Sequence, residues 1–263
     1  NDLVTGINLS GTGPVPAAEI AALLQTKEGR ILNMGTLRSD VERVQDHYKT
    51  KGFTAVVSQD VVIEKGILNI PVIVSTIDAI KIAGATKTRP IVVVREMKSK
   101  VGDYFNVDEL GKDITRIFNT NLFEDLSPSI IQKGLGKVEI TLNVQEKRTG
   151  IVSVFVGYSS RNSLVGGAEV GEENFLGRGQ QVSLRWDTGG VANRNSFELS
   201  FLEPWVDRRH TSLQASVYDK TVYRFGQSIG SLGTGGFNSD DYYEVHTGGQ
   251  VTVSRPLSEK ARG

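Results

Sequence analysis

The sequence predicts a mixed fold, in which two tandem α+β modules of order β-α-α-β-β precede an antiparallel β-sheet. Two observations predict it. In the first half of the chain, a pattern of apolar residues repeats after seventy positions, which indicates two copies of one supersecondary unit. In the second half, apolar and polar residues alternate with the period of two that a pleated strand imposes.

The first predicted module spans residues 1–76. Its second helix carries the clearest signal, because apolar residues from Leu37 to Tyr48 recur at spacings of four, three and four. That spacing places them on one stripe, which can pack on a small sheet. The expected elements are, in chain order, a strand near Leu3–Leu9, a helix opening at Pro14–Pro16, a helix over Thr36–Tyr48, and strands over Phe53–Val62 and Ile67–Ser75.

The second predicted module, residues 77–148, repeats this layout. The alternation of Leu68–Val74 recurs in Val138–Val144, and the same interval of seventy residues aligns Tyr48 with Phe118. We therefore expect Tyr48 and Phe118 to be equivalent core residues at the ends of the second helices. The expected elements are a strand over Ile77–Ile82, helices over Ile91–Met97 and Val107–Phe118, and strands over Ser129–Gln132 and Val138–Val144.

The junction between the modules is short. Ser75 ends the last strand of the first module, and only Thr76 separates it from the first strand of the second. Because almost no linker remains, we expect the two modules to hold a restricted relative angle.

Residues 149–263 are predicted to form about six antiparallel strands. Side chains of one parity are apolar, as in Val182, Leu184 and Trp186, and those of the other parity are polar. In a soluble sandwich the apolar faces would pack on a second sheet, whereas in an outer-membrane barrel they would face lipid. The alternation alone leaves both architectures open. The expected strands are Ile151–Tyr158, Leu164–Glu172, Gln180–Asp187, Ser196–Leu202, Thr211–Tyr223 and Tyr242–Ser254, with a Gly-rich loop over Gly226–Gly236 and a short turn over Pro256–Glu259.

The composition argues against several classes of function. With 30 basic and 30 acidic residues the formal net charge is zero, so nucleic acid is not an expected partner. The chain has no Cys, which excludes a disulfide framework and thiolate metal sites. No run of residues approaches the ~20 apolar residues of a spanning helix, so any passage through a membrane must use strands.

No catalytic or metal-binding constellation is expected. The three histidines fall in three different predicted elements. Gly11-Thr12-Gly13 lacks the third glycine of a dinucleotide motif and the Lys of a phosphate loop, and a strand-to-helix turn explains it. The acidic pairs Glu172-Glu173 and Asp240-Asp241 lie at strand ends, where solvated turn positions are common. The sequence therefore predicts no enzyme, no cofactor and no metal.

Two motifs at the strand breaks carry a family resemblance. Glu173–Gln180 reads Glu-Asn-Phe-Leu-Gly-Arg-Gly-Gln, and Phe201–Trp205 reads Phe-Leu-Glu-Pro-Trp at the end of the next hairpin. In this order and on these strands, they resemble the first barrel hairpins of the BamA-type outer-membrane protein assembly factors. The β-α-α-β-β layout resembles the polypeptide-transport-associated (POTRA) domain, and Asn119–Asp125 resembles that domain's turn from second helix to second strand.

The resemblance implies an outer-membrane protein assembly and insertion factor of Gram-negative bacteria, with its N-terminal domains in the periplasm. Its partners would be unfolded outer-membrane protein clients and outer-membrane lipid, with accessory lipoproteins as an optional addition. Client strands would add to an exposed edge of a module, since main-chain hydrogen bonds do not depend on side-chain identity. The first barrel strand would open sideways as a lateral gate and template the insertion of clients.

Each of these roles implies particular residues. The client-binding edges would contain Phe53, Ala55, Val57, Ser129 and Ile131. The lateral-gate strand would contain Ile151, Ser153, Phe155 and Gly157. The lipid-facing residues would be Val182, Leu184, Trp186, Phe197, Leu199, Phe201, Leu213, Ala215 and Val217.

Two alternatives stay open. A translocation pore of the two-partner secretion type also resembles this chain and carries two such periplasmic modules. A soluble two-module protein fused to a β-sandwich would instead bury Phe197, Leu199, Phe201 and Trp205 in a core. A family barrel needs about sixteen strands, so we expect residues 149–263 to be its incomplete N-terminal part.

Overall fold

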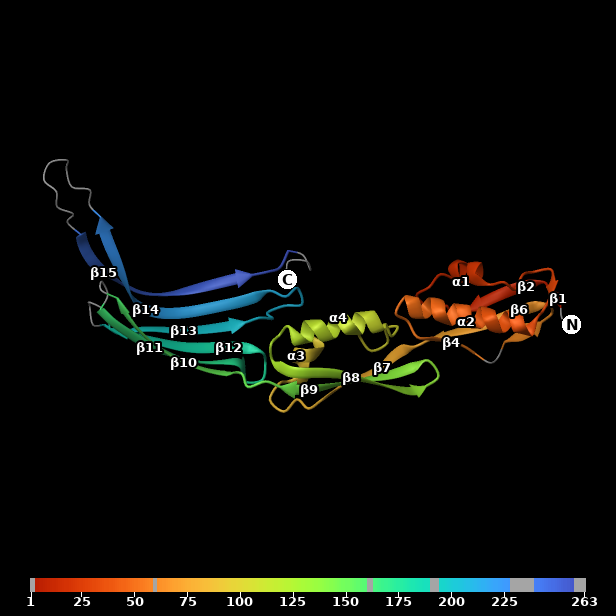
Figure 1. The fold of residues 1–263 in the computed structure, drawn as a ribbon, viewed down its shortest axis with the longest axis horizontal. Helices are drawn as coiled ribbons and strands as arrows, with labels where there is room; N and C mark the ends of the chain where they lie inside the picture. The colour runs from red at the N-terminus through yellow and green to blue at the C-terminus, as the bar shows by residue number, and fades with distance from the viewer. Residues whose placement is uncertain (1–2, 59–60, 160–162, 190–193, 228–238, 258–263) are drawn as a thin grey trace. The chain divides into compact units, whose positions relative to one another are not determined.

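The computed structural model describes residues 3–58, 61–159, 163–189, 194–227 and 239–257. The chain divides into two compact units: Asn1–Ala85 with Val93–Glu146, and Thr86–Val92 with Lys147–Gly263. The first unit holds both α+β modules, and the second holds a six-stranded antiparallel sheet (Figure 1). Within the described ranges, no helix combines the length and the apolar character needed to cross a membrane.

The first module packs two helices on a small sheet of order β2-β6-β4 (Figure 1). Strands β2 and β6 are parallel, β4 pairs antiparallel with β6, and β5 pairs with the other end of β6. A separate short pair joins β1 to β3. The elements are β1 (Leu3–Val4), β2 (Gly6–Ser10), α1 (Ala17–Leu23), β3 (Arg30–Ile31), α2 (Met34–Thr50), β4 (Ala55–Val57), β5 (Val62–Glu64) and β6 (Ile67–Val74).

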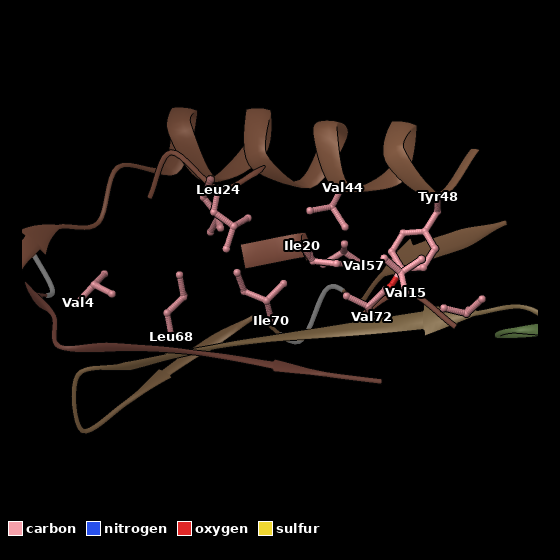
Figure 2. Packing of buried hydrophobic residues seen from close by; sticks show 12 residues of the cluster. Val4, Val15, Ile20, Leu24, Val44, Tyr48, Val57, Leu68, Ile70 and Val72 are labelled. Carbon is pink, nitrogen blue, oxygen red and sulfur yellow. The ribbon is translucent and has the colours of Figure 1, made fainter. Parts of the chain in front are cut away.

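The core of this module lies between the helices and the sheet. Figure 2 shows Val44 and Tyr48 of α2 pointing toward the apolar side chains of β6. Tyr48 is fully buried, and its hydroxyl donates to the backbone oxygen of Thr12 at 2.6 Å. Burial raises the pKa of Tyr48 to about 12, so the hydroxyl keeps the proton that it donates. The core residues of the module are Val4, Val15, Ile20, Leu24, Leu37, Val44, Tyr48, Val57, Leu68, Ile70, Val72 and Val74.

The second module repeats the architecture with a sheet of order β7-β9-β8. Strands β7 and β9 are parallel, and β8 pairs antiparallel with β9. Helix α4 begins after Asn106, whose side-chain oxygen accepts the backbone N–H groups of Asp108 and Glu109; Asn33 caps α2 in the same way. The elements are β7 (Thr76–Ala83), α3 (Pro90–Val94), α4 (Val107–Phe118), β8 (Phe123–Gly134) and β9 (Lys137–Glu146).

A buried carboxylate on α2 fixes the loop that follows α1. Asp40 accepts hydrogen bonds from the backbone N–H groups of Gln25 and Thr26, both at 2.8 Å, and Arg43 lies 3.0 Å from it. Burial works to raise the pKa of Asp40, but the hydrogen bonds from Gln25 and Thr26 and the charge of Arg43 outweigh it, so the pKa lies below its ordinary value. The carboxylate thus replaces the backbone partners that the loop lacks.

The second module contains the same device. Asp113 of α4 is fully buried and accepts the backbone N–H groups of Lys98 and Ser99. Arg116 pairs with Asp113 and also donates to the backbone oxygen of Glu96. An Asp followed three positions later by an Arg is therefore a repeated structural element, and the sequence reasoning above did not identify it.

Backbone hydrogen bonds join the two modules at their junction. The N–H of Phe105 donates to the oxygen of Ser75 at 2.8 Å, and the N–H of Val107 donates to the oxygen of Gly52 at 2.8 Å. Asn106 also donates through its side chain to the oxygen of Lys51 at 2.9 Å. These bonds restrict the junction, as the absence of a linker predicts.

The prediction that Phe118 is a core residue is wrong. Phe118 is 50% exposed, whereas the preceding Ile117 is fully buried. The helices align at an interval of 73 residues rather than 70, because the caps Asn33 and Asn106 and the carboxylates Asp40 and Asp113 correspond. The last strands, β6 and β9, begin 70 residues apart, and α4, with 12 residues, is shorter than α2, with 17. Phe118 therefore falls on the solvent side of α4.

The second unit is a sheet in which the strands follow chain order from β10 to β15. All neighbouring pairs are antiparallel, and the six predicted strands are confirmed, with ends that differ by up to four residues from those expected. Most of the expected Gly-rich loop and the end of the expected last turn lie outside the described residues. The strands are β10 (Gly150–Ser159), β11 (Ser163–Phe175), β12 (Gln180–Gly189), β13 (Ser196–Glu203), β14 (Ser212–Gln227) and β15 (Ser239–Ser254).

The burial pattern of α4 predicts different losses of stability at two adjacent positions. Ile117→Ala should lower the free energy of unfolding of residues 1–147 by about 2–5 kcal/mol, because it leaves a cavity in the core. Phe118→Ala should change it by about 0.5 kcal/mol or less. Urea unfolding of both variants measures the difference. Equal losses at the two positions would mean that this face of α4 is misassigned.

Candidate functional site

The longest open strand edge of the α+β modules belongs to β8. In the sheet of order β7-β9-β8, β8 has only β9 beside it among the described strands, and all of its residues from Ser127 to Gly134 are exposed. Ser129 and Ile131, both expected from the sequence, lie in this segment opposite Thr141 and Glu139. The edge is far longer than the four residues expected, because β8 runs from Phe123 to Gly134.

A proline shows which backbone groups of β8 face the open edge. Pro128 lies opposite Leu142, in a stretch where the pairing with β9 is regular from Asp125 to Gln132. Successive residues of an antiparallel strand direct their backbone groups alternately toward the neighbour and away from it, and proline is tolerated where its nitrogen faces away. By this alternation, Ile130 also directs its N–H to the open edge.

Charged side chains gather near one end of this edge. Glu139 of β9 lies 3.0 Å from Lys81 of β7 and 3.7 Å from Lys133 of β8. The hydrogen bond from Lys81, with the charges of Lys133 and Lys81, holds the pKa of Glu139 below its ordinary value against the opposing effect of burial. The side chain of Lys133 therefore extends toward β9. The exposed apolar side chains of the edge are Ile130 and Ile131.

The corresponding edge of the first module is broken, which corrects the expectation of a continuous strand over Phe53–Val62. Ala55 and Val57 lie on the edge strand β4, but β4 has three residues and Val57 is buried in the core. Ser58 faces Pro71 of β6, and a proline cannot return a hydrogen bond, so the pairing stops there. Phe53 lies outside β4 and forms an isolated bridge with Asn106.

Strand β10 forms the outer edge of the six-stranded sheet and pairs only with β11 among the described strands. Ile151, Ser153, Phe155 and Gly157 share one parity, and therefore one face of the strand. On this face the ring of Phe155 covers Gly167 of β11: a Cβ atom added to Gly167 would lie 2.6 Å from the ring. The guanidinium of Arg185 stands 5.4 Å from the centre of the same ring.

The opposite face of the sheet is largely apolar, although Asp219 lies in the row of Trp186 and Phe197. The nine residues expected to face lipid share this face, because the strand registers align them in rows such as Leu184, Leu199 and Val217. Strand β10 adds Val152, Val154 and Val156, which are 78%, 73% and 74% exposed and which the sequence reasoning did not name. The full set expected from the sequence is Val182, Leu184, Trp186, Phe197, Leu199, Phe201, Leu213, Ala215 and Val217.

The inner, polar face carries paired charges. Arg185 of β12 lies 3.1 Å from Asp187, and its register partners on both sides are Glu169 and Glu198. Lys220 of β14 lies 2.8 Å from Glu198. A face of ion pairs and small residues suits a wet lumen rather than a packed core.

Two of the three histidines lie beside a glutamate, and Gly11 lies in a turn between a strand and a helix. His47 contacts Glu19 at 2.8 Å, and His246 contacts Glu244 at 2.8 Å. Gly11 adopts φ +70°, and a Cβ there would lie 2.2 Å from the oxygen of Val72, so the strand-to-helix turn requires a glycine. Among the residues that the structure describes, no group of three or more His, Asp or Glu side chains could hold a metal ion.

Comparisons with known proteins agree with this architecture. The POTRA family model, described as a surface antigen variable number repeat, matches residues 3–75 and 75–147. The model of the Omp85 superfamily domain matches residues 174–263.

Curated relatives match most of the chain. Outer envelope protein 80 of rice chloroplasts is 25% identical over 98% of this chain and 41% of its own length. The outer membrane protein assembly factor BamA of Nitratidesulfovibrio vulgaris is 29% identical over 65% of this chain and 23% of its own. The chain thus spans less than half the length of these curated relatives, neither of which is named as an enzyme.

Solved structures share the fold. BamA of Haemophilus ducreyi lacking POTRA domains 1–3 matches 85% of this chain and 43% of its own with a TM-score of 0.55 and 20% identity. CdiB of Escherichia coli matches 88% of this chain and 44% of its own with a TM-score of 0.59 and 16% identity.

The fold therefore defines an outer-membrane protein with two periplasmic POTRA domains and an antiparallel sheet that begins a β-barrel. More particularly, the chain belongs to the Omp85 superfamily and is of the BamA type. Two of the relatives are named as outer membrane protein assembly factors.

The two faces of β13 predict different environments at adjacent positions. A spin label at Leu199 of the full-length protein in lipid should be accessible to oxygen and shielded from a water-soluble quencher, as expected of an apolar face that meets hydrocarbon. A label at Ser200 should show the reverse, because it faces the lumen. Power-saturation measurements test this pair. Shielding of position 199 from both reagents, in protein that stays folded, would indicate a sandwich core.

Proposed function

We propose that this chain belongs to an assembly factor that captures unfolded outer-membrane proteins by strand addition and templates their insertion. The observation that carries the proposal is the open edge of β8, which exposes backbone and apolar side chains over Ser127–Gly134. Incoming strands of many different sequences can extend such an edge, because main-chain hydrogen bonds do not depend on side-chain identity. The unequal edges of the two modules favour β8 over β4 as the capture site.

Insertion would then take place at β10. This strand has an open outer edge and a lipid-type apolar face formed by Val152, Val154 and Val156. A client strand that pairs with β10 satisfies its backbone groups before it enters hydrocarbon, where an unpaired group costs several kcal/mol. The lateral gate at Ile151, Ser153, Phe155 and Gly157 and the contact with outer-membrane lipid are part of this proposal. Accessory lipoproteins stay a prediction from the resemblance.

A second candidate is a two-partner secretion pore. The structural match to CdiB, with a TM-score of 0.59, and the presence of two POTRA domains favour it as an alternative. The two functions differ in the fate of the client. An assembly factor leaves it folded in the membrane, whereas a pore releases it on the far side.

The alternation in β8 predicts the effect of a single backbone change. In the full-length protein, Ile130→Pro should remove an outward N–H donor and weaken the binding of an unfolded outer-membrane client peptide by about threefold to tenfold, the effect of one hydrogen bond. The pairing of β8 with β9 should persist, because the nitrogen of residue 130 faces away from β9. Fluorescence titration of the labelled peptide measures the affinity.

The matched control is Ile130→Ala, which shortens the side chain and keeps the N–H. It should bind the peptide more tightly than Ile130→Pro does. If the two variants bind equally and both stay folded, the captured client does not use the backbone of this edge. Client that reaches the far side of a vesicle, rather than its membrane, would favour the pore.

A further inference from the structure

A short segment outside the strands supports the beginning of the six-stranded sheet. Thr86–Val92 follows β7 in sequence, but it belongs to the same compact unit as the sheet. The backbone N–H of Arg89 donates to the oxygen of Gly177, in the turn between β11 and β12, at 2.8 Å. The side chain of Lys87 lies 2.9 Å from Glu172 near the end of β11.

A buried side-chain hydrogen bond makes this contact specific. Asn174 is 2% exposed and Thr88 is 4% exposed, and the amide nitrogen of Asn174 donates to the hydroxyl of Thr88 at 2.8 Å. The amide oxygen of Asn174 accepts the backbone N–H of Gly179 at 2.8 Å. An unsatisfied buried amide is costly. The side chain of Asn174 therefore favours the arrangement in which Thr88 lies against it and accepts its hydrogen bond.

The glycine of the same turn permits the close approach. Gly177 adopts φ +70°, and a Cβ atom there would lie 1.9 Å from the backbone oxygen of Lys87. Any other residue would push the segment away and would also be strained. The motif Glu173–Gln180, which carried the family resemblance, thus has a physical reason: its Asn and its Gly receive the segment Thr86–Val92.

The same network reaches the first residue before β10. Thr149 is buried, and its hydroxyl donates to Glu172 and accepts a hydrogen bond from Lys87 at 2.9 Å. The backbone oxygen of Thr149 accepts the N–H of Glu173 at 2.9 Å. Glu172 therefore joins Lys87 and the base of β10, directly beside the pair Gly150 and Glu172 that starts the β10–β11 ladder.

We propose that Lys87, Thr88, Glu172 and Asn174 are positioning residues that clamp the base of β10 to β11. With this clamp in place, β10 exchanges strands only at its outer edge, and the β10–β11 seam stays closed while a client inserts. The inference rests on the proposed function, since it specifies which side of β10 a client uses. Farther along the seam lie Gly157, Gly166 and Gly167. Glycines weaken strand pairing, so the clamp secures the seam from its base, at the opposite end.

A disulfide across the seam tests the proposal directly. Val152→Cys with Val170→Cys joins direct register partners of β10 and β11, and Val154→Cys with Ala168→Cys provides a second pair. In full-length protein reconstituted in lipid vesicles, the oxidised and reduced forms should insert an outer-membrane client at rates within about twofold of each other. If insertion stops on oxidation and returns on reduction, the seam opens and the proposal is wrong. Failure of the unsubstituted protein to insert or bind any client would instead contradict the proposed function.

Hydrogen exchange locates the effect of the clamp. Thr88→Val removes the acceptor of Asn174, and Lys87→Ala removes the contact to Glu172; each should speed exchange at the start of β10 by about tenfold and leave β13 and β14 unchanged. Lys87→Arg should restore protection. Glu173→Gln is the matched control, because the described contact of Glu173 uses its backbone N–H. Client binding should persist in the clamp variants while insertion slows. Unchanged exchange at β10 in both clamp variants would overturn the proposal.

Discussion

The structure depends on one constraint: every strand has two sides of backbone hydrogen-bonding groups, and each sheet here leaves some of those groups open. In the second module the sheet ends at β8, and in the barrel part it begins at β10. The first module shows the contrast, since its edge is cut to three residues at Pro71 and partly buried. Strand addition is therefore expected at β8 and β10, where an edge stays open along the strand.

The polar interactions that hold the loops and the first hairpins are buried and specific. Asp40 and Asp113 each hold the loop between the two helices of a module by accepting two backbone N–H groups. Asn174 and Thr88 hold the first hairpins of the barrel sheet in a comparable way. A buried polar group destabilises the fold when it loses its partner. These groups therefore favour one defined arrangement of each module.

The strands and the main helices could be predicted because their periodicity is local. The alternation of Phe197, Leu199 and Phe201 predicts one face of β13 without any knowledge of its neighbours. The prediction for Phe118 is wrong because the helix caps Asn33 and Asn106 lie 73 residues apart, whereas the last strands β6 and β9 begin 70 residues apart. The paired Asp and Arg, which also lie 73 residues apart, could have revealed this difference. The role of Thr86–Val92 could not be predicted, since it depends on contacts with residues almost ninety positions away.

In the proposed function, a client strand pairs with the outer edge of β10 through its backbone. Site-specific disulfide crosslinking tests it most directly, with single cysteines at positions 151, 153 and 155 of the full-length protein and a series of single cysteines along the client's terminal strand. Backbone pairing in register predicts that moving the cysteine by two residues along β10 moves the crosslinked client position by two. Crosslinks that do not shift, or that form with no position on β10, would contradict the account.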